Sequence, residues 1–189
     1  KYKKAGKKFF LYLHYSNIHT EIMQNVLKKY NNFSSEYFSN KEKNIQFYNK
    51  LFFDSDVYLG KILQHYQNLN LDEDTLLVVI SDHGISTGEK FGERGYGVFC
   101  YDYTLLSGAM FCHKNIKPIQ IKNQVRSIDI LPTILELLSI NQDPAYEKIQ
   151  GKSLVPLMNG KIESRIAFSQ SGNPLSSSKP PKEPNVSAV

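Results

Sequence analysis

Asp82 and His83 stand side by side directly after an apolar run, and they carry the strongest chemical signal in the sequence. A carboxylate oxygen and an imidazole nitrogen at a strand end can both reach one divalent cation if the backbone turns there. Gly84 permits such a turn. These two ligands do not complete a site, because a catalytic zinc takes about three protein ligands and keeps one position open. A second interpretation stays open, in which the segment is a turn that ends the strand and is capped by the aspartate.

His14 and His19 stand on either side of the end of another apolar run, so both could face one pocket. Histidine changes its charge near neutral pH and can therefore protonate a leaving oxygen. His19 lies in a polar segment and is the better candidate for this role. His14 is expected to be an inward-facing strand residue bonded to backbone, with contact to a substrate as the alternative.

A glycine-rich loop over residues 85–104 follows the Asp82 segment and contains two cations, Lys90 and Arg94. Either cation could bind an oxyanion such as sulfate or phosphate. Glu93 and Tyr96 lie in the same loop. The alternative interpretation is a charged loop that is simply solvated.

Apolar runs predict the strands that position these residues. Such runs, which lack a polar alternation, occupy residues 9–15, 75–81, 105–112 and 166–168. A run of this kind is typical of a strand covered on both faces, as in a parallel sheet. In open α/β sheets, ligands bind beyond the carboxyl ends of the strands. The polar residues that follow the first two runs stand at such ends.

Apolar residues at spacings of three and four predict the helices. The longest amphipathic pattern covers residues 41–68. A second helix is predicted over residues 130–138, with Ser127 or Asp129 as its cap and Pro132 tolerated in its first turn. A short helix begins in residues 151–157. Strands that alternate with helices indicate an α/β architecture.

The composition is that of a soluble globular domain. The chain has 189 residues, of which 41% are hydrophobic and 22% charged, which excludes general disorder, a collagenous repeat and a disulfide scaffold. Its net charge of +5 comes largely from a basic start over residues 1–8, which we interpret as a solvated end. No basic stripe with interleaved aromatic residues follows, so no nucleic-acid partner is predicted. No apolar run reaches the roughly 18 residues of a membrane span.

Five short motifs follow one another along the chain. They are FFLYLHYSNIHT at residues 9–20, DVYLGKIL at 56–63, TLLVVISDHG at 75–84, SIDILPTIL at 127–135 and GKSL at 151–154. Each is weak alone. Together, in this order and spacing, they resemble the sulfatase family of the alkaline-phosphatase-like superfamily.

The resemblance implies a three-layer α/β sandwich with a central, mostly parallel sheet that is incomplete in this fragment. It implies hydrolysis of sulfuric esters at a divalent metal, with Asp82 and His83 as two of the metal ligands. The ion would be Ca, Mn or Zn, and the histidine moves the expectation toward Mn or Zn. His19 would assist the leaving oxygen. His14, Lys90 and Arg94 would contact a sulfated small molecule or saccharide.

The sequence departs from the family at the nucleophile. Neither Cys100 nor Cys112 stands in the C/S-x-P-x-R motif whose Cys or Ser becomes formylglycine, and the family's early Asp-Asp pair is missing. The resemblance therefore implies that residues 1–170 are the C-terminal portion of a sulfatase-like catalytic domain, with the nucleophile upstream. Residues 171–189 form a Ser/Pro/Lys-rich extended tail. The Lys or His that usually precedes the Tyr101-Asp102 pair is also absent.

Two other functions stay open at this stage. One is a phosphoester or phosphonate hydrolase, or a phosphoglycerol-type transferase, of the same superfamily, which His83 and the altered loop favour. An upstream threonine nucleophile would indicate that chemistry, and Cys-x-Pro-x-Arg would indicate sulfuryl chemistry. The other is a sulfatase-like module without catalytic activity.

Overall fold

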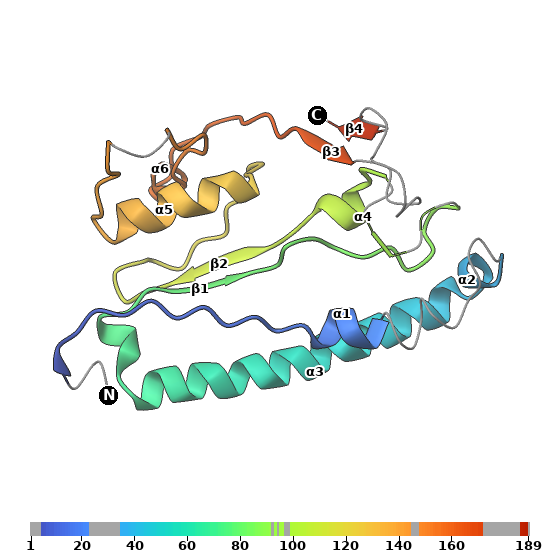
Figure 1. Ribbon diagram of the computed structural model, residues 1–189, viewed down its shortest axis with the longest axis horizontal. Coiled ribbons are helices and arrows are strands. Elements are labelled where there is room, and N and C mark those ends of the chain that lie inside the picture. The colour runs from blue at the N-terminus through green and yellow to red at the C-terminus, as the bar shows by residue number, and fades with distance from the viewer. Residues whose placement is uncertain are drawn as a thin grey trace. The chain divides into compact units, whose positions relative to one another are not determined.

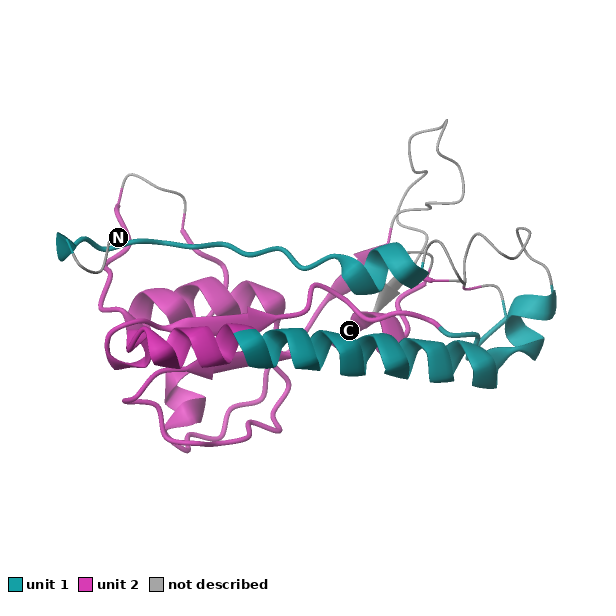
Figure 2. Ribbon diagram, turned by 90° about the horizontal axis from the view of Figure 1, so that it is seen from below, with its two compact units in different colours: residues 1–61, 87–92 teal, residues 62–86, 93–189 magenta. Residues whose placement is uncertain are grey.

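The computed structural model describes residues 5–22, 35–91, 93, 95–96, 99–144 and 148–171, and the backbone of 186–188 (Figure 1). The chain divides into two compact units. The first contains residues 1–61 and 87–92, and the second contains residues 62–86 and 93–189 (Figure 2). Arg94, one of the two predicted oxyanion-binding cations, lies outside the described residues.

Helices dominate the first unit. They are α1 (Asn17–Ile22), α2 (Ser35–Ser39) and most of α3 (Lys41–Asn68), which continues into the second unit. The buried side chains of Ile22, Tyr37 and Leu51 form the core of this unit. Asn44 is buried too, and its amide donates hydrogen bonds to the Tyr37 carbonyl at 2.9 Å and the Thr87 carbonyl at 3.0 Å. These bonds satisfy backbone groups that water cannot reach.

The long predicted helix is confirmed, since α3 covers residues 41–68. Its apolar face is less buried than the periodicity suggests. Leu51 is buried, but Phe52 and Tyr58 remain half exposed. Helical spacing places these residues on one face, but it does not determine how much of that face is covered.

The prediction of a strand over residues 9–15 is wrong. The segment is extended but pairs with no strand among the described residues, and Phe10 and Leu11 are 88% and 67% exposed. His14, expected to point inward, is exposed as well. An apolar run raises β-propensity, but a strand exists only where a neighbour accepts its backbone hydrogen bonds.

Two small sheets lie in the second unit. Strand β1 (Leu77–Ile80) pairs with β2 (Ala109–Cys112), and β3 (Ser169–Ser171) pairs with β4 (Val186–Ala188). The first pair aligns Leu77 with Cys112 and Ile80 with Ala109. Both pairs are antiparallel, so the predicted parallel pairing is not found among the described strands. The apolar pattern of β1 predicted burial, yet Leu77 to Val79 are half-buried and Ile80 is exposed, and such a pattern does not determine strand direction.

Two further strand predictions are only partly met. The strand predicted over 105–112 forms only at Ala109–Cys112, and α4 (Asp102–Leu105) ends at the first predicted residue. The prediction of a strand over 166–168 is wrong, because those residues form no strand and β3 begins at Ser169. A short 3-10 helix, η3 (Leu71–Glu73), precedes β1. A second 3-10 helix, η4 (Ser127–Asp129), leads into α5 (Ile130–Leu137), and α6 (Val155–Met158) follows. The helix predicted over 130–138 is thereby confirmed.

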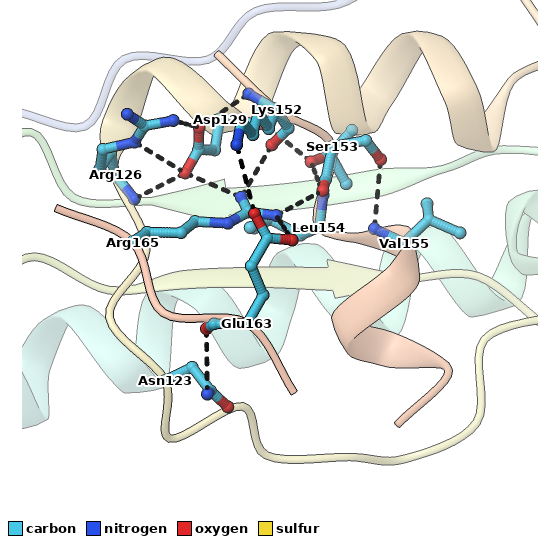
Figure 3. Close-up of polar contacts among 10 residues, drawn as sticks. Asn123, Arg126, Asp129, Lys152, Ser153, Leu154, Val155, Glu163 and Arg165 are labelled. Carbon is cyan, nitrogen blue, oxygen red and sulfur yellow. Dashed lines mark hydrogen bonds and ion pairs between the residues drawn. The ribbon is translucent and has the colours of Figure 1, made fainter. Parts of the chain in front are cut away.

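Asp129 organises the turn between η4 and α5 (Figure 3). The carboxylate is fully buried and accepts hydrogen bonds from two arginines. Arg126 Nη2 lies 2.8 Å from Oδ1, and Arg165 Nη1 lies 3.0 Å from Oδ2. The backbone N–H of Lys152 donates to Oδ1 at 2.9 Å. Asp129 was predicted as a helix cap, but its side chain makes no capping bond to α5. It accepts the Arg126 N–H at the start of η4 and joins η4 to two distant segments, at Lys152 and Arg165.

The same contacts hold residues 151–154 against α5. Arg165 donates to the carbonyls of Lys152 and Ser153, each at 2.9 Å. Leu154 N–H donates to Thr133 Oγ1 at 2.9 Å, and that hydroxyl donates to the Asp129 carbonyl at 2.6 Å. We call Asp129, Arg126, Arg165 and Thr133 the Asp129 cluster. The motifs at 127–135 and 151–154 therefore lie in contact, joined by the hydrogen bonds of Asp129 with Lys152 and of Thr133 with Leu154.

The Asp129 cluster makes the stability of the protein sensitive to acid. Burial alone raises the pKa of Asp129, but hydrogen bonds from Arg126, the Lys152 N–H and Arg165 outweigh it and lower the pKa from 3.8 to about 2. A folded-state pKa below the unfolded value stabilises the fold above about pH 4, and this stabilisation is lost as pH falls toward 2. The contribution at stake is about 2 kcal/mol.

We expect the free energy of unfolding of the intact protein that contains these residues to fall between pH 5 and pH 2. Denaturant titrations at a series of pH values measure it. In Asp129→Asn, which has no titrating group at this position, the fall should be smaller by about 2 kcal/mol. Parallel curves for the two proteins would show that Asp129 is not the group responsible.

Candidate functional site

Asp82 and His83 follow β1 at the point where its pairing with β2 ends. Ser81 is the last paired residue, because its N–H donates to the Gly108 carbonyl and its Oγ accepts the Gly108 N–H, both at 3.0 Å. The Asp82 side chain is therefore the first beyond the sheet, and 81% of it is exposed. The sequence predicted this placement correctly.

His83 is held in one defined orientation. Its Nδ1 lies 2.8 Å from the Gly84 carbonyl oxygen. A carbonyl only accepts hydrogen bonds, so Nδ1 must carry the proton and donate. In the neutral ring, Nε2 then has a free lone pair. Metal-binding histidines commonly show this arrangement, in which the second ring nitrogen is fixed by a backbone carbonyl.

The remaining contacts direct the Asp82 carboxylate toward His83. Asp82 Oδ1 accepts the His83 N–H at 2.9 Å, and Oδ2 lies 3.6 Å from His83 Nε2. A hard oxygen and an imidazole nitrogen so close together suit a divalent ion such as Mn or Zn. These two donors fit part of a metal site. In the described part of the chain, no group of three or more His, Cys, Asp or Glu side chains gathers that could hold a metal ion.

Tyr96 packs against His83. The two ring centroids lie 4.0 Å apart with an interplanar angle of 36°. Burial raises the pKa of Tyr96, and the charge of Asp82 raises it further. The phenol therefore stays neutral at physiological pH. This contact links the loop after β1 to the predicted metal ligands.

Gly84 is required by a close approach and not by the turn that the sequence suggested. Its φ is not positive. A Cβ at this position would collide with the carbonyl oxygen of Tyr103. Gly84 N–H donates to the Thr104 carbonyl at 2.9 Å, so α4 is packed directly against the segment that carries His83.

Glu93 is the site-supporting residue whose role the sequence did not reveal. It is fully buried, and its carboxylate accepts the Phe99 N–H at 3.1 Å and the Tyr103 hydroxyl at 3.4 Å. Its carbonyl accepts the Ser86 hydroxyl at 3.1 Å. The sequence feature that could have indicated this burial is the position of Glu93 among glycines and aromatic residues. Aromatic side chains can shield a carboxylate from water, and a tyrosine can donate a hydroxyl hydrogen bond to it. The described part of this loop is therefore ordered around a buried carboxylate.

The other predicted site residues belong to the first unit. His14 is exposed in the extended segment, with its ring 6.4 Å from that of Tyr12. His19 is exposed on α1, and Lys90 is exposed after β1. The structure brings Asp82, His83 and Tyr96 together. The roles of His14, His19 and Lys90 stay predictions.

Comparison with known protein families identifies the family of this chain. The family model described as Sulfatase matches residues 1–140. The chain belongs to the sulfatase family. The resemblance drawn from the five motifs is thereby confirmed.

Individual sulfatases are similar at moderate identity. Arylsulfatase K of Rattus norvegicus is 29% identical over 139 residues, which cover 72% of this chain and 24% of the relative. Choline-sulfatase of Rhizobium meliloti is 26% identical over 125 residues, covering 63% of this chain and 24% of the relative. The chain thus spans about a quarter of the length of the sulfatases it matches.

A solved hydrolase shares the fold of the matched part. The phosphonate monoester hydrolase from Silicibacter pomeroyi superimposes with a TM-score of 0.54 at 26% identity, covering 67% of this chain and 24% of that chain. The matched part of the chain therefore shares the arrangement of helices and strands of that hydrolase. Among the helices that the structure describes, none is sufficiently long and apolar to cross a membrane.

Proposed function

We propose that the intact protein is a metal-dependent hydrolase of sulfuric esters and that Asp82 and His83 supply two of its metal ligands. The observation that carries this proposal is the His83 geometry, with Nδ1 donating to Gly84 and Nε2 lying 3.6 Å from Asp82 Oδ2. Membership of the sulfatase family supports it, as do relatives named arylsulfatase K and choline-sulfatase. The substrate class would be a sulfated small molecule or saccharide.

The proposed roles follow from the chemistry of each side chain. A bound divalent ion would act as a Lewis acid toward the sulfate oxygens. Asp82 and His83 would hold it through one oxygen and one nitrogen. His19 would protonate the leaving alkoxide as a general acid. His14, Lys90 and Arg94 would contact the substrate, with the two cations pairing with its anionic oxygens. The formylglycine-type nucleophile would come from upstream of residue 1.

We further propose that the sheet of β1 and β2 belongs to a larger, mostly parallel sheet of a three-layer sandwich. Residues 1–170 would be the C-terminal portion of that catalytic domain, and residues 171–189 an extended tail. The exposed apolar side chains of Phe10 and Leu11 support a larger domain, because isolated soluble domains rarely expose contiguous apolar segments.

A second candidate is hydrolysis of phosphonate or phosphate monoesters, or phosphoglycerol-type transfer. His83 favours it, because a nitrogen ligand suits the softer ions, and so does the structural similarity to a phosphonate monoester hydrolase. The two candidates share the metal ligands and differ in the atom attacked.

A turnover assay of the intact protein distinguishes these functions. We expect 4-nitrophenyl sulfate to be hydrolysed with Mn²⁺ present, and the activity to vanish after chelation and return when Mn²⁺ is restored. Faster turnover of 4-nitrophenyl phenylphosphonate would favour the second candidate. Absence of turnover of either ester, together with folding that is indifferent to chelator and to Asp82→Ala, would contradict both and leave a non-catalytic module. The 189-residue chain alone should show no turnover, because it lacks the nucleophile motif.

A further inference from the structure

We propose that Tyr96 is a positioning residue for His83, whose ring keeps the imidazole oriented so that Nε2 is presented beside Asp82. The inference rests on the proposed metal site, because an oriented Nε2 matters only if it binds an ion. It assigns a role to a loop residue that is itself neither a proposed metal ligand nor a proposed substrate contact.

The imidazole needs more than its hydrogen bond to stay oriented. A half-turn about the Cβ–Cγ bond exchanges the positions of the Nδ1 and Cδ2 sides of the ring and moves Nε2 away from Asp82. Within the described part of the chain, the hydrogen bond that opposes this rotation is Nδ1–H to the Gly84 carbonyl at 2.8 Å. One such bond contributes about 1 kcal/mol net, which leaves the wrong orientation populated at roughly one part in six. The His83 side chain is also 32% exposed, so solvent can replace that bond.

The Tyr96 ring supplies the additional restraint. At a centroid separation of 4.0 Å and a tilt of 36°, it lies against one side of the imidazole. Aromatic contacts of this kind contribute about 0.5–1.5 kcal/mol beyond their buried area. Rotation about the Cα–Cβ bond would carry the imidazole away from Tyr96 and break that contact, whereas a half-turn about Cβ–Cγ keeps the imidazole in the same plane. The Tyr96 ring therefore fixes where the imidazole lies, and the Nδ1–H bond to the Gly84 carbonyl, which needs that placement, selects which edge of the ring faces Asp82.

The loop holds Tyr96 firmly enough for this purpose. The preceding residue, Gly95, is buried, has a φ of 82° that favours glycine, and accepts the Ser86 N–H at 2.6 Å. The buried carboxylate of Glu93 accepts the Phe99 N–H at 3.1 Å. Backbone anchors therefore lie on both sides of Tyr96. The Tyr96 ring is thereby tied through Gly95 to the segment that follows β1.

The test compares two substitutions of Tyr96 in the intact protein. Tyr96→Phe keeps the ring, and Tyr96→Leu removes it. Tyr101→Leu is the matched control, because the Tyr101 ring packs on Phe99 and Tyr103, each at 5.4 Å. Mn²⁺ affinity is measured by electron paramagnetic resonance titration. We expect Tyr96→Leu to weaken Mn²⁺ binding about 10-fold, as loss of an orienting contact does. Tyr96→Phe and Tyr101→Leu should stay within about twofold of the unsubstituted protein.

A spectroscopic readout without metal tests the orientation itself. In protein labelled with ¹⁵N-histidine, His83 should show a protonated Nδ1 and an unprotonated Nε2, with nuclear Overhauser contacts to the Tyr96 ring. In Tyr96→Leu the two nitrogen shifts should move toward each other as tautomers and rotamers mix. Tyr96→Phe should retain the original pattern. If Tyr96 only stabilised the fold, Tyr96→Leu would lower the free energy of unfolding without changing the nitrogen shifts of His83.

The outcomes separate this inference from the proposed function. Unchanged Mn²⁺ affinity and unchanged ¹⁵N shifts in Tyr96→Leu would overturn the inference, and so would equal losses in the Phe and Leu variants. If Tyr96→Leu does not fold, absence of Tyr96–His83 contacts in the unsubstituted protein overturns it, and their presence with a protonated Nδ1 supports it. Failure of the proposed metal site would appear differently, as Mn²⁺ affinity that does not change in Asp82→Ala.

Discussion

Asp129→Asn is expected to lower the free energy of unfolding of the intact protein by about 3–5 kcal/mol, the usual cost of breaking a buried ion pair. The side chain of Arg165 is almost completely buried, and its Nη1 lies 3.0 Å from Asp129 Oδ2. Asparagine has nearly the same shape as aspartate, so the loss comes from charge and not from a cavity. Its NH₂ group cannot accept from a guanidinium, and the buried Arg165 cation retains only the longer contact of its Nη2 with Glu163 Oε2, at 3.5 Å, among the described carboxylates.

Urea unfolding followed by circular dichroism measures this loss. The matched control is Asp54→Asn, because Asp54 pairs with Lys50 at 2.6 Å across an exposed helix surface. Water screens that pair, so the control should change stability little. Adding Arg165→Met to Asp129→Asn should recover part of the loss, because it removes a buried cation that has lost its closer carboxylate partner. A loss below about 1 kcal/mol, equal to that of the control, would contradict a central role for the Asp129 cluster.

Asp82→Ala is expected to reduce kcat/KM of the intact protein toward 4-nitrophenyl sulfate by about 10³-fold. The proposed ion would lose its carboxylate ligand, and metal stabilisation of developing charge amounts to several kcal/mol. The substitution should cost little stability, because 81% of the Asp82 side chain is exposed. Among the described residues, its backbone hydrogen bond is with the N–H of the adjacent His83, at 2.9 Å.

Two measurements test whether Asp82 is a metal ligand. Mn²⁺ affinity should fall together with kcat/KM in Asp82→Ala, whereas Glu136→Ala, which removes an exposed carboxylate from α5, should leave both unchanged. A fall of less than about 10-fold in kcat/KM, with Mn²⁺ affinity retained, would show that Asp82 does not hold the ion.

Local patterns predicted the helices well. The bounds of α3 coincide with residues 41–68, and α5 ends one residue before the predicted Leu138. Helical periodicity is a property of neighbouring residues, and each helical hydrogen bond joins residues four apart. The placement of Asp82 directly after β1 was predictable for the same reason, since the apolar run and the polar residue are adjacent in sequence.

Predictions that depended on distant partners were less successful. Residues 9–15 have the apolar pattern of a strand, yet they pair with no strand among the described residues. β1 and β2 pair in antiparallel fashion, although their composition suggested a parallel sheet. Side-chain type indicates how much of a strand can be buried. Pairing and direction depend on which backbone lies alongside, and that is a long-range choice.

The sequence by itself determined the family, the long helix and the adjacency of a carboxylate and an imidazole after an apolar strand. Only the tertiary structure decided which nitrogen of His83 is free, that Tyr96 packs on its ring, and that Glu93 orders the loop. It also decided that Asp129 binds two arginines and does not cap α5. The physical reason is the range of the interactions. Periodicity and propensity act over a few residues, whereas the contacts of Asp129 with Lys152 and Arg165, and of His83 with Tyr96, join segments that only folding brings together.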